Sequence, residues 1–244
     1  MSVYCATDLH GNLAIAKQIV DIANEGNTIY FLGDACDRGK HGWEIIKMFL
    51  RNENIVYLMG NHEDMLIKAM RPYFMRNGEY DMLTHDMEVW SWNGNENTLD
   101  TILEDDFEKA SIYYSQLHTL KMFEEYVNPD GDKIYMCHSG WEYFIRDPYH
   151  DLQYNKKILW DRNHYYEPEW LGYENEYMIH GHTPCPYLHD EIGLSTDPDW
   201  TVAAGPYQYC DGHKVDMDAL TIQTHSAFLL NLDTYECRIL EGDE

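Results

Sequence analysis

The stretch Val3-Tyr4-Cys5-Ala6-Thr7-Asp8-Leu9-His10-Gly11 joins a short apolar run to a polar turn, and the same arrangement occurs twice more within the first 63 residues. The second copy follows the run 28–32 and contains Gly33-Asp34-Ala35-Cys36-Asp37-Arg38-Gly39. The third follows the run 55–59 and contains Gly60-Asn61-His62-Glu63. Apolar runs of this length predict buried β-strands. Because the carboxyl ends of strands in an open α/β sheet converge on one crevice, we expect the three polar clusters to meet there.

Amphipathic segments separate these three strands. Residues 13–24 and 42–52 are predicted to be helices, and Asn12 is a suitable N-cap for the first. The resulting βαβαβ order implies parallel strands joined by right-handed crossovers. No convincing strand follows between residues 63 and 126, where Met-, Trp- and acid-rich helical stretches surround a turn at 93–95. We therefore predict a helical insertion over roughly 64–128.

The remaining third of the chain predicts further strands. Two are expected at 133–138 and 177–180, each followed by a loop. The segment 183–208 holds four of the eight prolines and is predicted to be an irregular surface loop. The chain is then expected to end in antiparallel strands at 213–216, 227–232 and 235–240. At 244 residues, it is expected to form one α/β domain, 1–244.

Composition limits the class of protein. Hydrophobic residues make up 44% of the chain, which excludes a disordered protein. No apolar run approaches the roughly 18 residues of a membrane-spanning helix. The first residues lack the basic and apolar regions of a signal peptide, so a cytoplasmic location is expected. The six cysteines show no metal-finger spacing, and buried thiols are the simplest interpretation.

The net charge is extreme, at −26 from 43 acidic and 17 basic residues. Such a charge argues against nucleic-acid binding through a basic surface. It suits a highly solvated surface, and it also suits the selection of basic partners. Anionic substrates are repelled at long range, although salt screens this repulsion beyond roughly 8–10 Å.

Two later clusters, His138-Ser139-Gly140 and His180-Gly181-His182-Thr183-Pro184, also follow predicted strands. Together with the first three clusters they provide more ligands than one tetrahedral zinc ion needs. Such a set suits two metal ions about 3.5–4 Å apart with one carboxylate between them, and Asp34 is the natural bridge. Mixed oxygen and imidazole ligands favour Mn, Fe or Zn. The candidate ligands are Asp8, His10, Asp34, Asn61, His138, and either His180 or His182.

The five motifs D-x-H-G, G-D-x-x-D-R-G, G-N-H-E, H-S-G and G-H-T-P, spread over residues 8–184, resemble those of the calcineurin-like metallophosphoesterases. More narrowly, they resemble the phosphoprotein phosphatase (PPP) branch, which includes bacterial and phage serine/threonine protein phosphatases. The Arg of the second motif and the Glu of the third point to this branch. The resemblance implies two mixed β-sheets packed as a sandwich, flanked by helices and carrying a helical insertion.

The resemblance also implies a role for each motif residue. A metal-bridging hydroxide would be the nucleophile, because two divalent ions lower the pKa of bound water. The family places its last ligand in G-H-T, which selects His182; side-chain alternation does not make that choice, because residues two apart on a strand face the same side. The implied ligands are Asp8, His10 and Asp34 for the first metal, and Asp34, Asn61, His138 and His182 for the second.

Other motif residues match catalytic and phosphate-binding positions of the family. His62 would act as the general acid that protonates the leaving alkoxide, and Asp37 would orient it. Arg38 and Arg162 would clamp the phosphate oxygens. Around them, Glu63 is expected to support the site, and the segment 90–94 either faces the cleft or packs in the core. Two residues depart from the family pattern. Cys36 is expected to be an inert thiol, and His180 has no assigned role.

These roles predict a dinuclear metal-dependent phosphatase that hydrolyses phosphomonoesters, with phosphoserine and phosphothreonine in proteins as the leading substrates. The alternative is a symmetrical dinucleoside-tetraphosphate hydrolase that uses the same centre. The two differ in what frames the cleft, which we expect to be residues 64–128 and 183–212. A metal-bound but inactive binding module is disfavoured, because His62, Arg38 and Arg162 are all present. The expected partners are phosphorylated proteins or small phosphoesters, without nucleic acid or membrane.

Overall fold

The computed structural model describes residues 1–78, 84–140, 156–166, 169–191 and 205–242. Its first sheet begins with the predicted βαβαβ unit. The strands β1 (Val3–Ala6), β2 (Thr28–Phe31) and β3 (Ile55–Tyr57) pair in parallel, and α1 (Leu13–Asn24) and α2 (Gly42–Arg51) connect them.

Asn12 is the N-cap of α1, as predicted, because its side-chain oxygen accepts the backbone N–H of Ile15 at 3.1 Å. This bond satisfies one of the amides that the first helical turn leaves without a partner.

The C-terminal strands complete the first sheet. The strand β9 (Ser226–Asn231) lies antiparallel to β1, and β10 (Cys237–Glu241) lies antiparallel to β9. The strand order is β10-β9-β1-β2-β3, so the sheet is mixed. The predicted terminal hairpin is confirmed, since Asn231 accepts the backbone N–H groups of Asp233 and Thr234 at its turn.

A second mixed sheet has the order β4-β5-β6-β8-β7. Its strands are β4 (Phe123–Val127), β5 (Lys133–Cys137), β6 (Glu176–His180), β7 (Tyr207–Tyr209) and β8 (Lys214–Asp216). The prediction that β8 belongs to an antiparallel C-terminal group was wrong in one respect. It pairs in parallel with β6 and antiparallel only with β7, because the chain crosses back to this sheet before β9 joins the other one.

Two further expectations are corrected by the structure. The strand β4 lies in a region predicted to be helical throughout; it is an edge strand with two glutamates and an exposed Val127, so it lacks the apolar alternation that marks a buried strand. The segment 183–208 is not irregular throughout, because it contains α7 (Cys185–Glu191) and the start of β7. Residues 192–204 of that predicted loop lie outside the described residues.

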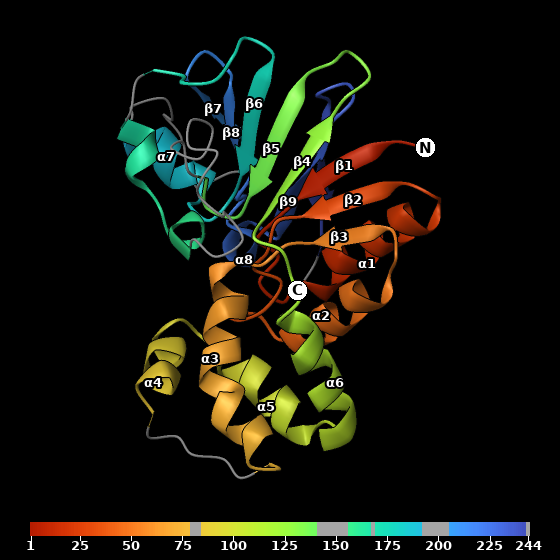
Figure 1. Ribbon diagram of the computed structural model, residues 1–244, viewed down its shortest axis with the longest axis vertical. Helices are drawn as coiled ribbons and strands as arrows, with labels where there is room; N and C mark the ends of the chain where they lie inside the picture. The colour runs from red at the N-terminus through yellow and green to blue at the C-terminus, as the bar shows by residue number, and fades with distance from the viewer. Residues whose placement is uncertain (79–83, 141–155, 167–168, 192–204, 243–244) are drawn as a thin grey trace.

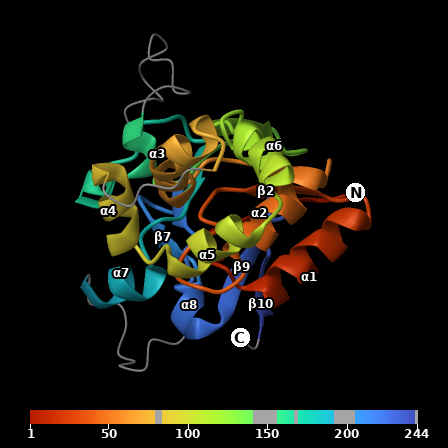
Figure 2. The same ribbon diagram turned by 90° about the horizontal axis from the view of Figure 1, so that it is seen from below.

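Four helices follow β3 before the chain enters the second sheet. They are α3 (Asn61–Met75), α4 (His85–Trp92), α5 (Glu96–Glu104) and α6 (Phe107–Leu117). They gather at one end of the molecule below the sheets, and they lie nearest the viewer when the molecule is seen from that end (Figures 1 and 2). Shorter helical turns are η3 (Lys156–Leu159), η4 (Asn163–Tyr166) and α8 (Thr221–Thr224).

Two hydrophobic cores hold these layers together. One contains Leu32 of the turn after β2, Met136 of β5, Ile179 of β6 and Phe228 of β9, so it lies between the two sheets. The other joins the first sheet to the helices. The architecture is therefore α/β, with two mixed sheets packed face to face and helices outside, as predicted. Within the described part of the chain, no helix has the length and apolar character needed to cross a membrane.

Candidate metal centre

The predicted metal ligands converge at the carboxyl ends of strands from both sheets. All six are buried, although they come from segments spread over 175 residues of the sequence. This convergence follows from the parallel pairing of β1, β2 and β3 and of β5 and β6, because parallel strands end at the same edge of a sheet. Asp8 and His10 follow β1, Asp34 follows β2, Asn61 begins α3 after β3, His138 follows β5, and His182 follows β6.

Asp34 lies at the middle of this group. Its Oδ2 atom is 3.4 Å from Nε2 of His138 and 3.8 Å from Nε2 of both His10 and His62. Two sets of ligand atoms can each surround one ion, and Asp34 belongs to both. The sets are His10, Asp34 and His62, and Asp34, His138 and His182. A carboxylate shared in this way is the feature expected of a dinuclear site.

The histidine rings are fixed by hydrogen bonds on their outer side. Nδ1 of His10 donates to the carbonyl of Cys36 at 3.0 Å, and Nδ1 of His138 donates to the carbonyl of Leu32 at 2.9 Å. Each ring is therefore oriented with Nε2 toward Asp34. Backbone carbonyls in this role fix the tautomer and ring orientation of metal-binding histidines.

Asn61 lies beside two residues of the second set of candidate ligands. Its Oδ1 atom lies 2.7 Å from Nε2 of His138 and 2.9 Å from Nδ1 of His182. His180 stands apart: its Nδ1 lies 3.1 Å from the carbonyl of Gly181, and its Nε2 lies 2.8 Å from the hydroxyl of Tyr209. The structure thus brings His182, rather than His180, to the candidate centre.

Two buried polar atoms of this centre have no hydrogen-bond partner among the described residues, namely Oδ1 of Asp8 and Nε2 of His182. Leaving a buried polar atom unpaired costs about 1–3 kcal/mol, so such atoms need a ligand. Oxygen and imidazole donors suit a transition-metal ion, and the donor set therefore fits the metals implied by the sequence. One detail differs: His62 joins the first set of ligand atoms, whereas Asp8 remains 3.9 Å from Nε2 of His10.

Burial shapes the electrostatics of the carboxylates. It raises the pKa of Asp8 well above the usual range, and the negative charges of Asp218 and Asp34 add to the rise. Asp218 is a buried acid that the sequence analysis did not single out, and burial raises its own pKa to about 6. Its signal was weak, because it lies beyond the end of the short strand β8. A cation bound beside these carboxylates would relieve the repulsion between them.

The backbone at the site adopts an unusual conformation. Twelve non-glycine residues in the described segments have a positive φ, and half of them are predicted site residues. Left-handed backbone is costly for such residues and persists where surrounding structure enforces it, which is common at functional sites. The six are Asp8, His10, Asp34, Asp37, Arg38 and His182.

Beside the predicted metal ligands, Asp37, His62 and Arg38 form a connected group. Oδ2 of Asp37 lies 2.7 Å from Nδ1 of His62, and both side chains are fully buried. Burial lowers the pKa of His62, but the carboxylates of Asp34 and Asp37 outweigh it and raise that pKa above its ordinary value. The exposed Arg38 directs its guanidinium toward the rings of His62, at 3.2 Å, and His10, at 3.0 Å.

The helical insertion supports this group directly. The indole of Trp90 in α4 is fully buried and donates to Oδ2 of Asp37 at 2.7 Å. Thr98 in α5 accepts the backbone N–H of Asp37 at 3.0 Å, and the carbonyl of Gly94 accepts that of Arg38 at 2.6 Å. Segment 90–94 was expected either to face the cleft or to pack in the core. Trp90 is buried and packs against the Asp37–His62 pair. Sequence reasoning missed Thr98, since an isolated threonine carries no motif.

Arg162 lies on a different side of the site. It is exposed, its Nε donates to the hydroxyl of Thr183 at 3.2 Å, and it lines a cavity of about 340 Å³ with residues of η4 and α7. Its positive charge contributes to a lowered pKa at His182, after the larger effects of burial and of His138. Arg38 lies in the connection that follows β2 of the first sheet, whereas Arg162 lies in the connection between β5 and β6 of the second.

His180 belongs to a buried hydrogen-bond network under this second side. The hydroxyl of Tyr209 lies 2.8 Å from Nε2 of His180 and 2.7 Å from Nδ1 of His164. Nε2 of His164 in turn donates to the carbonyl of Ser139 at 2.8 Å. This network ties the turn that carries Arg162 to the turn that carries His138. It gives His180 a structural role, which a single sequence could not indicate.

Glu63 holds the turn that carries Asp34. Its carboxylate accepts the backbone N–H groups of Asp34 at 2.8 Å, Ala35 at 2.9 Å and Gly60 at 2.9 Å, and the hydroxyl of Tyr57 at 2.8 Å. All four partners are donors, so only a group that accepts at every position satisfies them. Glu63 is fully buried, and it supports the site by accepting these four hydrogen bonds.

Replacing Glu63 by glutamine is therefore expected to destabilise the fold by at least about 2 kcal/mol, because an amide NH₂ would face donors that need an acceptor. Urea unfolding of the metal-free protein, followed by circular dichroism, measures this change. Glu53→Gln removes the same charge from an exposed turn and serves as the control. Equal unfolding midpoints for the two variants would contradict the role given to Glu63.

Comparison with known proteins places this geometry in context. A family model described as calcineurin-like phosphoesterase matches residues 1–186. A search of curated protein sequences gives no match.

Several solved structures are similar over nearly the whole chain. A putative diadenosine tetraphosphatase has 13% identity and a TM-score of 0.62, over 99% of this chain and 94% of that one. A cold-active protein tyrosine phosphatase has 14% identity and a TM-score of 0.56, over 98% and 75%. A protein serine/threonine phosphatase from Saccharomyces cerevisiae, with similarity to human phosphatase PP5, has 12% identity and a TM-score of 0.56, over 100% and 81%. At these identities the similarity establishes a shared fold.

Proposed function

The chain belongs to the calcineurin-like phosphoesterase family, and from this premise we propose that it is a dinuclear metal-dependent phosphatase of phosphomonoesters, with phosphoserine and phosphothreonine in proteins as its leading substrates. One observation carries the proposal: a buried Asp37–His62 pair lies beside a carboxylate that belongs to two sets of candidate metal-ligand atoms, and the Arg38 guanidinium contacts His62. Metal binding alone needs neither the pair nor the arginine, whereas phosphate-ester hydrolysis uses both.

Two divalent ions, preferably Mn and otherwise Fe or Zn, would be held by the six predicted ligands. Bound there, they would supply a water molecule of lowered pKa and positive charge beside the phosphoryl group. The remaining chemistry belongs to the side chains nearby. Asp8, His10 and Asp34 are proposed for the first ion, and Asp34, Asn61, His138 and His182 for the second.

Arg38 is proposed to bind the phosphoryl oxygens through its two terminal nitrogens, which the planar guanidinium presents in parallel. In the structure these nitrogens lie 3.0 Å from Nε2 of His10 and 3.2 Å from Nε2 of His62, so the guanidinium already lies at the edge of the centre. His62 is proposed to transfer a proton from Nε2 to the leaving alkoxide. Asp37 holds the opposite ring nitrogen at 2.7 Å, which orients Nε2 toward Asp34.

The indole of Trp90 is proposed to position this acid pair. Trp90→Phe keeps an aromatic ring but removes the N–H from which Asp37 accepts, so kcat is expected to fall by about tenfold, the change that corresponds to ~1.4 kcal/mol. The KM for an aryl phosphate and the metal content should stay unchanged. Trp92→Phe, at a position 75% exposed in the same helix, is the matched control. A kcat equal to that of the control would remove Trp90 from the mechanism.

The charge of the chain supports a protein substrate. A net charge of −26 attracts basic segments around a phosphorylated residue and repels a polyanionic nucleotide during approach. A second candidate, a symmetrical dinucleoside-tetraphosphate hydrolase, is favoured by one local feature. A cavity beside Arg38 and His10 also carries Lys40, and such a cavity suits a substrate with additional phosphates.

Parallel rate measurements on a phosphothreonine peptide with flanking basic residues and on diadenosine tetraphosphate test the choice. With Mn in excess, we expect the higher kcat/KM for the peptide. A higher value for the dinucleotide would replace the leading candidate by the second one. If no divalent metal supports turnover of the peptide, the dinucleotide or an aryl phosphate, the proposed phosphatase function is refuted. His62→Asn prepared in the same way controls for contaminating phosphatases.

A further inference from the structure

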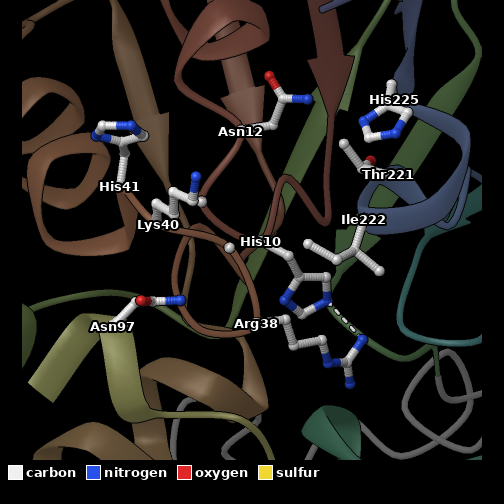
Figure 3. Close-up of a pocket in the computed structure, with 11 residues that line it drawn as sticks. His10, Asn12, Arg38, Lys40, His41, Asn97, Thr221, Ile222 and His225 are labelled. Atoms are coloured by element: carbon white, nitrogen blue, oxygen red, sulfur yellow. Dashed lines mark hydrogen bonds between the residues drawn. The ribbon is translucent and has the colours of Figure 1, made fainter. Parts of the chain in front are cut away.

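A cavity of about 350 Å³ opens beside Arg38 and His10 (Figure 3). The turn after β1, the segment leading into α2, and the helices α5 and α8 form its walls. A volume of this size lies within the range of small-molecule sites, about 300–1,000 Å³. The lining residues are His10, Gly11, Asn12, Arg38, Gly39, Lys40, His41, Asn97, Thr221, Ile222 and His225.

The cavity is cationic in a strongly acidic protein. Its lining contains Arg38, Lys40 and three histidines but no aspartate or glutamate, although the chain has 43 acidic residues. The lining residues next to α2 also lie beside the N-terminal end of that helix, which carries partial positive charge. The local field in this cavity therefore favours an anion, whereas the protein as a whole repels one.

Lys40 has no acidic partner among the residues that the structure describes. Other lysines of this chain have such partners: Lys47 lies 2.7 Å from Asp105, and Lys68 lies 2.6 Å from Asp64. Lys40 is exposed and lines the same cavity as Arg38, so its ammonium group is available to a ligand that occupies the cavity.

Neutral groups complete the cavity. The side chain of Asn97 makes no hydrogen bond with another described residue, so its amide can donate to a ligand. The side chain of Ile222 points into the cavity from α8, on the side opposite Lys40 (Figure 3). The lining thus combines charged and polar donors with a small apolar surface, which suits an anionic group attached to a larger molecule.

We propose that this cavity is a subsite for a second phosphoryl group of the substrate, with Lys40 as its principal cationic contact. The inference rests on the proposed function, because it assumes that Arg38 binds the phosphoryl group under attack. The second phosphoryl group comes either from the next position of a polyphosphate chain or from a second phosphorylated residue of a peptide. Both sources place the same tetrahedral anion beside Lys40.

Two phosphonates that cannot be hydrolysed test the subsite without turnover. Methylphosphonate carries one phosphoryl group, and methylenediphosphonate carries two. Their dissociation constants are measured by calorimetry on the Mn-loaded protein with Mn in excess, for the wild type, Lys40→Gln and Lys109→Gln. Lys109 is exposed on α6 and is absent from the cavity, so its variant removes the same charge elsewhere.

The wild type is expected to bind the diphosphonate more tightly than the monophosphonate. Lys40→Gln should reduce the ratio of the two affinities by about tenfold, as expected for the loss of one charge-assisted hydrogen bond. Lys109→Gln should leave the ratio unchanged. An unchanged ratio in Lys40→Gln, or an equal loss of both affinities, would overturn the proposal, because Lys40 would then not contact a second phosphoryl group.

Substrates identify the source of the second phosphoryl group. If it belongs to a polyphosphate chain, Lys40→Gln lowers kcat/KM for diadenosine tetraphosphate and spares the difference between singly and doubly phosphorylated peptides. If it belongs to a second phosphorylated residue, the preference for the doubly phosphorylated peptide is lost instead. An enzyme that hydrolyses none of these substrates would refute the proposed function alone, since the calorimetric ratio still decides the subsite.

Discussion

Replacing Asp34 by asparagine is expected to remove metal binding from both halves of the centre and to lower kcat/KM by at least about a thousandfold. Replacing a residue that only supports a metal ligand usually lowers metal affinity or activity by about 10- to 100-fold. Replacing Asp34 should lower activity further, because its Oδ2 atom lies within 3.8 Å of His10, His62 and His138 and belongs to both sets of candidate ligand atoms. An amide lacks the negative charge that holds two divalent ions close together.

The metal content per chain, measured by atomic spectroscopy after loading and gel filtration, distinguishes this loss from a catalytic defect. Asp34→Asn should retain less than one equivalent under conditions in which the wild type retains two. Asp100→Asn, at an exposed position of α5, makes the same chemical change away from the centre and should behave as the wild type. Two retained equivalents in Asp34→Asn would exclude Asp34 as the bridge.

His62→Asn is expected to lower kcat by about 10²–10⁴-fold while the metal content stays at the wild-type value, as general-acid catalysis contributes that much. The loss should depend on the leaving group. A phosphoserine peptide releases a strongly basic alkoxide and needs the proton, whereas an aryl phosphate releases a weakly basic phenoxide and needs it less. The variant should therefore lose more activity on the peptide than on the aryl ester.

Metal content also decides between two roles for His62. Its Nε2 atom is close enough to His10 and Asp34 to join them around an ion, although its Nδ1 atom is held by Asp37. If His62 is the acid, His62→Asn keeps two equivalents of metal, and the effect differs between leaving groups. If His62 is a ligand, one equivalent is lost and both substrates suffer equally. His85→Asn, which is exposed, is the control.

Sequence periodicity predicted the elements that carry the site because those elements are buried and regular. The helix α1 begins and ends at the predicted residues, and β1, β2 and β3 lie where the apolar runs ended in polar turns. Where the pattern depends on the environment of the folded chain, prediction failed. The strand β4 is a polar edge strand. The strands that pair with β8 are determined by the path of the chain between the two sheets.

The candidate site shows the same division. Residue types and their positions at strand ends led to six candidate ligands that the structure brings together, because strand direction places such turns at one edge. The hydrogen bonds that support them could not be anticipated. Trp90 reaches Asp37 across 53 positions of sequence, and Glu63 is matched to donors of two turns only after folding. Left-handed backbone at Asp37 and Arg38 likewise depends on contacts with the helical insertion.

A manganese titration of the chelated protein tests the dinuclear centre most directly. Hydrolysis of p-nitrophenyl phosphate is measured while metal is added to protein freed of ions and dialysed from the chelator. We predict no turnover without metal and a rise that reaches its plateau at two equivalents per chain. Full activity in the chelated protein, or a plateau at one equivalent, would contradict hydrolysis by two ions that share Asp34.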